Sequence, residues 1–365
     1  MGTITRSFAN NITSGGTFDA TDLTGTIPAS NIADASVTNI TAVPSLTAVS
    51  TVASDPPSPD AGQIWYNTTD KALRAYVVGG TGSWATGNDM NTAKNFLAGA
   101  GTQTSALGFG GSGPIALTES YDGTSWTEVN DLNTARLWLA GAGADNTSAL
   151  AFGGYLSTAV GTNVTESWNG TSWTEVNDLN TARLQLAGAG TNTSALAFGG
   201  KIPPSTLTAV TESWNGTSWT EVNDLGTARY GLGGVGEDNT SALAFSGVGP
   251  GSRVTNTETW NGTSWTEVND MVTARSFLAG AGTATAALGF GGEGPTFLGN
   301  TEQWNGASWT EVADLSLGRY GLAGAGNTTA GLAFGGDGSP PGSALVNTEE
   351  WNGAGSPTTR TITSS

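Results

Sequence analysis

The sequence predicts an all-β protein whose larger part is a closed β-propeller of six blades. The first observation is that the dipeptide Ser-Trp recurs with spacings of 42, 47, 46, 46 and 44 residues, and a period of about 40 to 50 residues is typical of propellers and other repeat folds. The second is that other residue columns keep the same period, so the repeat does not depend on one motif. The repeating tryptophans are Trp84, Trp126, Trp173, Trp219, Trp265 and Trp309.

Three further columns define the repeating unit. A basic residue opens each copy, at Lys94, Arg136, Arg183, Arg229, Arg275 and Arg319. A glycine pair ends the second predicted strand at 110–111, 153–154, 199–200, 291–292 and 335–336, and Ser246-Gly247 stands there in the remaining copy. An aromatic residue precedes a tight turn, at Tyr121, Trp168, Trp214, Trp260, Trp304 and Trp351.

One copy, residues 136–179, contains four short predicted strands. Their sequences are LWLAGAG, SALAFGG, VTESW and SWTEVNDL, and the second alternates apolar residues before a glycine stop. Asn169-Gly170 joins the last two strands as a two-residue hairpin turn, which requires positive φ at both positions. Because the first strand holds mostly Gly, Ala and Leu, we expect it to lie innermost, where strands converge on the propeller axis. The tryptophan columns then fill the wedges between blades, and a buried tryptophan removes roughly 150–250 Å² from water.

These columns together resemble the kelch repeat, which has a basic residue, a glycine doublet and two spaced aromatic residues. The resemblance covers roughly residues 82–352 and implies a propeller of four-stranded blades. Tryptophan replaces the usual tyrosine of the third strand in all copies except the first, which has Tyr121.

The strand count predicts how the ring closes. A Ser-Trp strand at Trp84 stands alone before the first complete unit, and the unit beginning at Arg319 ends at Trp351 without one. We therefore expect the strand around Trp84 to complete the sixth blade, which leaves no open edge between the chain ends. In the alternative, residues 358–363 (TTRTIT) supply that strand and residues 73–86 form an extra partial hairpin.

The N-terminal region differs in composition from the repeats. We divide the chain into a short extended attachment and oligomerisation segment at 1–62, a connecting β-hairpin at 63–81 and the propeller at 82–365. The texts FDATDLTGTIPASNIADASVTNIT and DPPSPDAGQIWYNTTDKALRAYV resemble attachment regions of bacteriophage tail fibres and related virion appendages. That resemblance implies a homotrimeric anchor that contacts other virion proteins, followed by a variable C-terminal domain. The alternative is a disordered tail, which a Thr-, Ser- and Asn-rich composition also fits.

Composition excludes several classes of protein. The net charge of −18 disfavours nucleic acid as a partner, because phosphate backbones bind basic surfaces. No apolar run is long enough for a membrane span, so no membrane insertion is expected. The chain has no Cys and no His, which removes thiolate metal sites and the commonest general base. The N-terminus also lacks a secretion signal, as expected for a virion protein assembled in the host cytoplasm.

Acidic residues recur in every copy and therefore predict a structural role. Each TE-x-aromatic glutamate is expected to pair with a repeat arginine or with backbone N–H groups, because buried charges are normally paired. A glycosidase needs one special carboxylate pair, whereas these columns offer equal copies. The acidic turn residues Asp145, Glu237 and Asp238 lack the spacing of a calcium loop. We therefore expect no enzyme activity, no metal and no cofactor. The repeated glutamates are Glu119, Glu166, Glu212, Glu258, Glu302 and Glu349.

The copies differ most in the loops between their second and third strands. These loops share one face of a propeller with the inter-blade loops, and binding residues concentrate on loops that a rigid scaffold holds. Tyr155, Lys201, Arg253 and Phe297 are the candidate receptor-binding residues there. The sequence thus favours a virion structural protein, a tail fibre or appendage, whose propeller binds a host-surface glycan or protein. The alternatives are a capsid or tail decoration, and a polysaccharide-degrading propeller enzyme.

Overall fold

A computed structural model describes residues 50–54, 64–77, 82–156, 160–338, 340–353 and 358–361. The chain divides into two compact units, Ser83–Gly353 and a smaller one formed by the segments before and after it. Among the described residues every regular element is a strand, and no helix occurs that could cross a membrane. The predicted attachment role of residues 1–62 falls mostly on positions outside the described residues.

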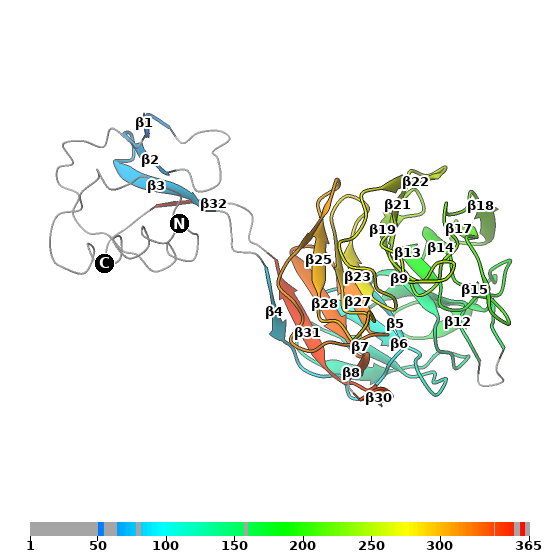
Figure 1. Ribbon diagram of the computed structural model, residues 1–365. Helices are drawn as coiled ribbons and strands as arrows, with labels where there is room; N and C mark the ends of the chain where they lie inside the picture. Colours follow the sequence, from blue (N-terminus) through cyan, green and yellow to red (C-terminus); the bar gives the residue numbers. More distant parts are fainter. Residues whose placement is uncertain are drawn as a thin grey trace. The chain divides into compact units, whose positions relative to one another are not determined.

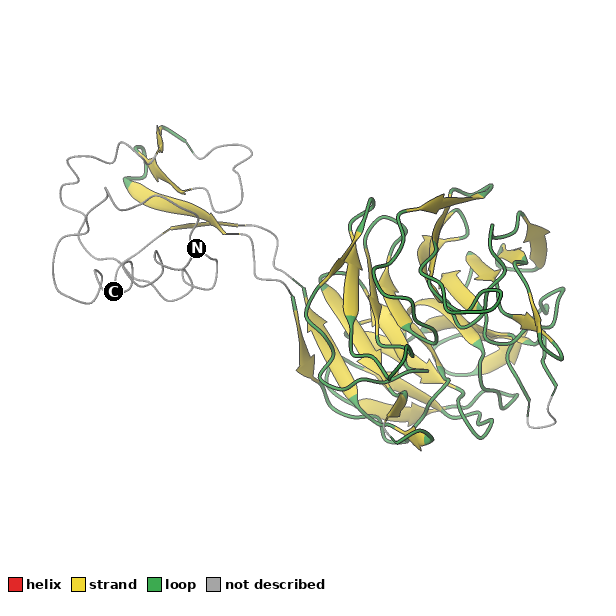
Figure 2. Cartoon of the chain, in the orientation of Figure 1, coloured by secondary structure: helices red, strands yellow, loops and turns green. Residues whose placement is uncertain are grey.

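The larger unit is a six-bladed β-propeller, and each blade is a four-stranded antiparallel sheet (Figures 1 and 2). Blade 1 contains β5 (Ala98–Thr102), β6 (Ser105–Phe109), β7 (Thr118–Tyr121) and β8 (Trp126–Val129). Blade 2 contains β9 (Ala140–Asp145), β10 (Ser148–Phe152), β11 (Thr165–Trp168) and β12 (Trp173–Glu175). Blade 3 contains β13 (Ala187–Gly190), β14 (Ala195–Phe198), β17 (Thr211–Trp214) and β18 (Trp219–Val222).

The remaining blades repeat the same plan. Blade 4 contains β19 (Gly233–Asp238), β20 (Ser241–Phe245), β21 (Thr257–Trp260) and β22 (Trp265–Val268). Blade 5 contains β23 (Ala279–Gly282), β24 (Ala287–Phe290), β25 (Thr301–Trp304) and β26 (Trp309–Glu311). Blade 6 contains β27 (Ala323–Gly326), β28 (Ala330–Phe334), β31 (Thr348–Asn352) and β4 (Ser83–Thr86). Two short hairpins lie in the loops, β15 (Lys201–Ile202) with β16 (Thr206–Leu207) and β29 (Asp337–Gly338) with β30 (Ser343–Ala344).

The ring closes through the N-terminal strand β4. It pairs antiparallel with β31, and Trp84 lies opposite Trp351. The predicted completion of blade 6 by the Trp84 segment is therefore confirmed. The alternative in which residues 358–363 supply this strand is wrong, because β32 (Thr358–Thr361) pairs with β3 (Ala72–Val77) of the smaller unit.

The smaller unit contains one sheet of order β1-β2-β3-β32, where β1 is Ser50–Val52 and β2 is Ile64–Asn67. Strands β2 and β3 form an antiparallel hairpin within the expected 63–81 region. The propeller ends at Gly353, and not at 365 as we expected, because the last described strand belongs to this sheet. In chain order, the whole propeller is therefore inserted between the paired strands β3 and β32.

The propeller core is layered from the axis outward. Inner strands approach so closely that a Cβ on Gly141 would lie 2.9 Å from the carbonyl oxygen of Gly99 in the preceding blade, and 2.7 Å from the Phe109 ring. This explains why the first strand of each blade is rich in Gly and Ala. Farther out, Trp173 packs on Phe109 with ring centroids 4.9 Å apart and donates from Nε1 to Thr118 Oγ1 at 3.1 Å. The predicted wedge of aromatic residues thus joins neighbouring blades.

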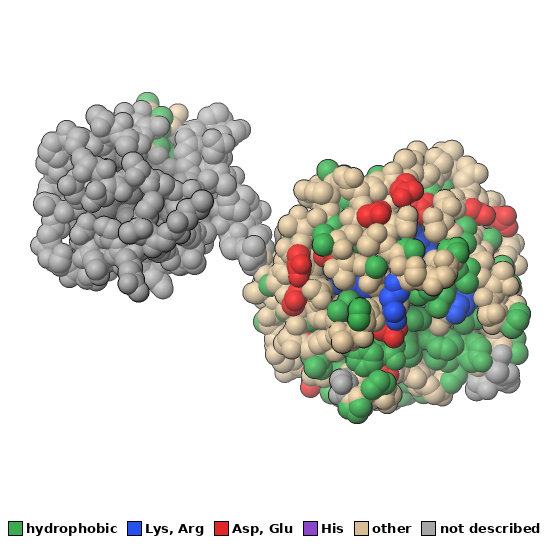
Figure 3. Space-filling view, viewed as in Figure 1, with side chains coloured by type: hydrophobic (Ala, Val, Ile, Leu, Met, Phe, Trp, Pro, Cys, Tyr) green, Lys and Arg blue, Asp and Glu red, His purple; other side chains and the backbone are tan. Residues whose placement is uncertain are grey.

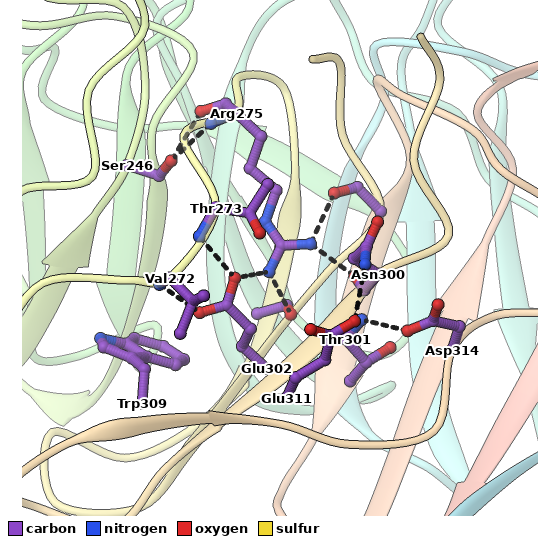
Figure 4. Close-up of polar contacts among 12 residues, drawn as sticks. Ser246, Val272, Thr273, Arg275, Asn300, Thr301, Glu302, Trp309, Glu311 and Asp314 are labelled. Atoms are coloured by element: carbon purple, nitrogen blue, oxygen red, sulfur yellow. Dashed lines mark hydrogen bonds and ion pairs between the residues drawn. The ribbon is translucent and has the colours of Figure 1, made fainter. Parts of the chain in front are cut away.

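A buried ion pair lies inside every blade, as the acidic column predicts. Figure 4 shows the copy in blade 5, where Arg275 Nη2 lies 3.0 Å from Glu302 Oε1. Glu302 also accepts hydrogen bonds from the backbone N–H groups of Val272 and Thr273. Burial lowers the pKa of Arg275, and Glu302 opposes that shift. The other pairs are Lys94–Glu119, Arg136–Glu166, Arg183–Glu212, Arg229–Glu258 and Arg319–Glu349.

Candidate binding site

The propeller has two unlike faces. On one, here called the turn face, the strand 3–4 turn at Gly170 lies against Thr147 of the strand 1–2 turn. The strand 3–4 turns are nearly identical in blades 1 to 5, blade 6 has none because β4 comes from the other end of the chain, and the strand 1–2 turns vary in sequence and length. On the other, here called the loop face, the strand 2–3 loops meet the inter-blade loops, as in the antiparallel bridge between Ile115 and Arg136. The inner strands begin at the loop face. This grouping of loops agrees with the prediction from the repeat.

A closed ring of backbone hydrogen bonds surrounds the axis at the loop face. Each blade contributes the residue two positions after its basic residue, and each N–H donates to the carbonyl oxygen of its neighbour in the preceding blade. The six N···O distances lie between 2.6 and 3.0 Å. We call these residues the hexad: Phe96, Trp138, Gln185, Gly231, Phe277 and Gly321.

Every member of the hexad has a left-handed backbone, with φ between 52° and 62°. Glycine adopts this conformation readily, but for the four other members it is strained by about 1–2 kcal/mol each. The ring of hydrogen bonds imposes the same backbone on all six. The side chains nevertheless differ from blade to blade, so the scaffold holds unlike groups in equivalent places.

The hexad surrounds a cavity of about 90 Å³, here called the mouth pocket. Its second layer is uniform, because one leucine from each blade follows the hexad residue. These leucines are Leu97, Leu139, Leu186, Leu232, Leu278 and Leu322. The pocket therefore has a constant apolar wall and a variable rim, and no charged residue lines it within the described part of the chain.

Aromatic rings form a connected cluster over the mouth pocket. The Phe96 ring lies 5.7 Å from Trp138, 5.6 Å from Phe277 and 5.4 Å from Tyr320 between centroids. The glycines of the hexad leave room for neighbouring rings, because a Cβ on Gly321 would lie only 2.7 Å from the Phe96 ring. Figure 3 shows hydrophobic side chains, with a few basic and acidic ones among them, gathered over the middle of the propeller.

Two of the predicted receptor-binding residues extend this cluster. Tyr155 is half-buried, and its ring lies 5.4 Å from that of Trp138. Phe297 packs on Tyr320 at 4.6 Å. A continuous path of ring contacts, through Trp138, Phe96 and Tyr320, thus joins two loops that are far apart in the sequence.

The other two predicted residues border the same cluster and carry charge. The ammonium of Lys201 lies 3.5 Å from the centroid of the Tyr230 ring, which in turn contacts Phe277 at 6.1 Å. Arg253 forms an ion pair with Glu293 at 2.8 Å and donates from Nε to Ser276, which precedes Phe277. The structure therefore brings all four predicted residues to the rim of one aromatic cluster.

Polar atoms without partners occur within this region. Trp138 Nε1, a donor, and Gln185 Oε1, an acceptor, are buried and make no hydrogen bond, and both residues line the mouth pocket. Asn95 Oδ1 is also buried without a partner, while the amide nitrogen of Asn95 donates to Asp337 at 2.8 Å. Because most buried polar atoms in folded proteins are satisfied, such a group marks a place for water or a ligand.

Two carboxylates near the cluster break the sixfold pattern. Glu293 and Asp337 follow the glycine pairs of blades 5 and 6, where the other blades have Ser112, Tyr155, Lys201 and Val248. Asp337 is buried and accepts hydrogen bonds from the N–H groups of Gly342 and Ser343. Burial raises the pKa of Tyr320, and the nearby charges of Asp337 and Glu293 raise it further.

The acidic turns contain no candidate metal centre among the described residues. Asp145 and Asp238 instead accept hydrogen bonds from the threonine two positions ahead, at Thr147 and Thr240. These bonds lower the pKa of both aspartates. Both aspartates therefore stabilise the turns in which they lie.

Sequence reasoning missed the hexad. The signal was present, because residues two positions after the basic column vary from Phe to Trp, Gln and Gly while the leucine that follows each of them is constant. The variation was not recognised because we assigned this column to the predicted inner strand, whereas the observed inner strands begin two residues later. Tyr230 and Tyr320 were missed for the same reason.

Comparison with solved structures supports the fold. The structure of YjhT aligns with a TM-score of 0.62 and 13% sequence identity, over 72% of this chain and 96% of that one. At this identity the likeness shows a shared β-propeller fold alone. No protein-family model and no curated protein matches the chain.

Proposed function

We propose that this chain is a non-enzymatic bacteriophage virion protein, a tail fibre or similar appendage, whose loop face binds a receptor on the host surface. The observation that carries the proposal is the contrast between the two faces. The strand 3–4 turns of the turn face are nearly identical in blades 1 to 5, whereas the loop face carries an aromatic cluster with Tyr155, Lys201, Arg253 and Phe297 around its rim. All four side chains are half-buried, and aromatic and charged side chains that stay partly open to solvent on a rigid scaffold are typical of recognition surfaces.

The kelch-like columns account for the scaffold and for its closure. Segment 1–62 then serves as the attachment to other virion proteins and as a trimerisation region. Three linked propellers would convert weak single contacts into strong attachment, because linked sites bind at a high effective concentration. A truncated chain of residues 63–365 that remains trimeric in sedimentation analysis would contradict this role for the segment.

Cell binding tests the recognition face. Fluorescently labelled full-length protein is applied to a panel of bacterial strains, and bound fluorescence is compared with that of Tyr155→Ala and Phe297→Ala. Both variants lose binding by at least tenfold if the loop face carries recognition. Thr171→Ala, at an exposed site on the turn face, is the matched control and keeps full binding. Loss in the control alone, or no strain bound by the wild type, overturns the proposal.

A polysaccharide-degrading enzyme is the second candidate, and Glu293 and Asp337 are the observation that favours it. They are the acidic residues that depart from the repeat near the mouth pocket. Arg253 holds Glu293 and backbone N–H groups hold Asp337, an arrangement that a structural role also explains. Release of reducing ends from capsular polysaccharide by the wild type, abolished by Glu293→Gln, would favour the enzyme over the recognition protein.

A further inference from the structure

We propose that the mouth pocket binds one neutral sugar ring, the terminal residue of a glycan chain. The inference rests on the proposed function, which makes the loop face a recognition surface, and it names the ligand class and the subsite. Its starting point is that the pocket combines aromatic plates, an unpaired donor, an unpaired acceptor and no charge.

Aromatic rings supply the apolar part of the site. Phe96, Trp138 and Phe277 are half-buried, so their rings are partly open to solvent at the mouth of the pocket. Sugar rings carry one face of C–H groups, and such faces pack on aromatic side chains while their hydroxyls remain at the edge. Three rings around one axis can therefore hold a ring-shaped ligand in a fixed orientation.

The unpaired polar atoms define what the ligand must offer. Trp138 and Gln185 are neighbours in the hexad, joined by the hydrogen bond from Gln185 N to Trp138 O at 2.9 Å. Trp138 Nε1 requires an acceptor, and Gln185 Oε1 requires a donor. A hydroxyl group is both, whereas a carboxylate offers acceptors alone.

The lining argues for a neutral ligand. Besides Gln185, the pocket residues are aromatic, leucine or glycine. A charged group buried against them would lose its hydration without gaining a partner, which is costly. Lys201 lies outside this lining, over Tyr230, and Arg253 is paired with Glu293. Both charged side chains are therefore placed to contact the second sugar of the glycan and not the terminal sugar in the pocket.

The size of the cavity limits the ligand to one ring. Its volume is about 90 Å³, room for about three water molecules at ~30 Å³ each. One edge of a sugar ring fits such a space while the rest of the ring lies against the aromatic rim, and a second ring does not enter. The site therefore takes the end of a glycan chain and not an internal segment.

The backbone gives an independent indication. Phe96, Trp138, Gln185 and Phe277 hold left-handed conformations that side chains other than glycine rarely adopt. Gly231 and Gly321 show that glycine serves in the same ring. Side chains kept at a strained position, in contact with one pocket, are a mark of a binding site.

Calorimetric titration of the full-length chain tests the inference. The probes are glucose, galactose, mannose, N-acetylglucosamine and glucuronic acid. At least one neutral sugar should bind with millimolar affinity, and glucuronic acid should bind at least tenfold more weakly. Gln185→Leu replaces the amide group by an apolar side chain of similar size, and Trp138→Phe keeps an aromatic ring but removes the indole N–H. Each should weaken binding about tenfold. Thr171→Ala, at an exposed site on the opposite face, is the control and should change affinity less than twofold. Lys201→Met is measured beside it to detect any contribution of charge.

The outcomes separate this inference from the proposed function. If no neutral sugar binds, or if glucuronic acid binds more tightly and depends on Lys201, the pocket assignment is overturned even when labelled protein still binds cells. If a neutral sugar binds and depends on Gln185 but no strain is recognised, the assignment stands and the proposed function fails. Sugar binding that is unchanged in both Gln185→Leu and Trp138→Phe also overturns the inference, whatever their effect on stability.

Discussion

The indole nitrogen of Trp84 donates a hydrogen bond to Thr301 Oγ1 at 2.9 Å, although 217 positions separate the two residues. Trp265 makes the equivalent bond to Thr211 at 3.0 Å between two blades in mid-chain. Each indole also packs on a phenylalanine of the preceding blade at 4.9 Å. The strand that closes the ring therefore makes the same contacts as a strand inside it.

Trp84→Ala and Trp265→Ala should destabilise the propeller equally. Both tryptophans are half-buried and have the same partners, so each substitution should reduce the free energy of unfolding by about 3 kcal/mol. Chemical denaturation followed by tryptophan fluorescence measures both. A loss for Trp84→Ala of less than half that for Trp265→Ala would show that β4 is only loosely held.

Gly141→Ala should destabilise the inner ring despite the small change. The added Cβ would lie 2.7 Å from the Phe109 ring and 2.9 Å from the Gly99 carbonyl oxygen, and neither neighbour can move without shifting a strand. Overpacking of this kind costs about 1–3 kcal/mol. The thermal midpoint should fall measurably, whereas Val272→Ala, at a side chain that is 63% exposed, should leave it nearly unchanged. Equal midpoints for the two variants would contradict the tight packing.

Arg183→Met should cost more stability than Arg183→Lys. The methionine leaves Glu212, whose side chain is 0% exposed, without its counter-ion, and breaking a buried pair costs about 3–5 kcal/mol. Lysine keeps the charge and loses hydrogen bonds that the guanidinium donates to the backbone carbonyl oxygens of Gly199, Val210 and Ala197. Blade 1 already uses Lys94 at this position. Chemical denaturation of the two variants measures which is less stable. Equal stabilities would contradict the expectation that the positive charge opposite Glu212 stabilises the blade.

Features that repeat were accessible from the sequence. The blade number, the strand order and the glutamate–arginine pairs followed from columns that recur in every copy. The closure by Trp84 followed from counting strands. All of these depend on local pattern and on the need to pair buried charges and strand edges, which are general physical requirements.

Features formed by residues from different blades could not be predicted from the sequence. The hexad side chains are 42 to 47 residues apart in most copies, and only the closed ring places them together. Their left-handed backbone has no marker where the residue is Phe96 or Trp138, because aromatic residues ordinarily avoid it. The pairing of β32 with β3 was also hidden, because a four-residue strand at the chain end fits either sheet edge.

Tyr121→Phe should make stability less sensitive to alkaline pH. Tyr121 donates to Glu350, and burial, followed by this hydrogen bond, raises its pKa. A raised folded pKa contributes stability below the unfolded pKa of roughly 10, and that stability is lost as pH rises further. Burial lowers the pKa of Lys94, which acts in the opposite direction over the same range.

The thermal midpoint measured between about pH 9 and pH 11 gives the comparison. The wild type should lose stability over this range, and Tyr121→Phe should lose less while being less stable near neutrality. Tyr320, whose pKa burial also raises, remains in the variant and retains part of the slope. Parallel curves for the two proteins would contradict the assignment to Tyr121.

Gln185→Gly should leave the propeller as stable as the wild type or more stable by about 1 kcal/mol. The substitution removes a left-handed non-glycine backbone and a buried acceptor without a partner, which together cost about 2–4 kcal/mol. The lost side-chain burial and the added chain entropy offset roughly 2 kcal/mol of that gain. Leu186→Ala, at the next position, is the matched contrast and should lose about 2–5 kcal/mol. Stability that rises while sugar binding falls identifies a residue kept for recognition, and a loss as large as that of Leu186→Ala would make Gln185 part of the scaffold.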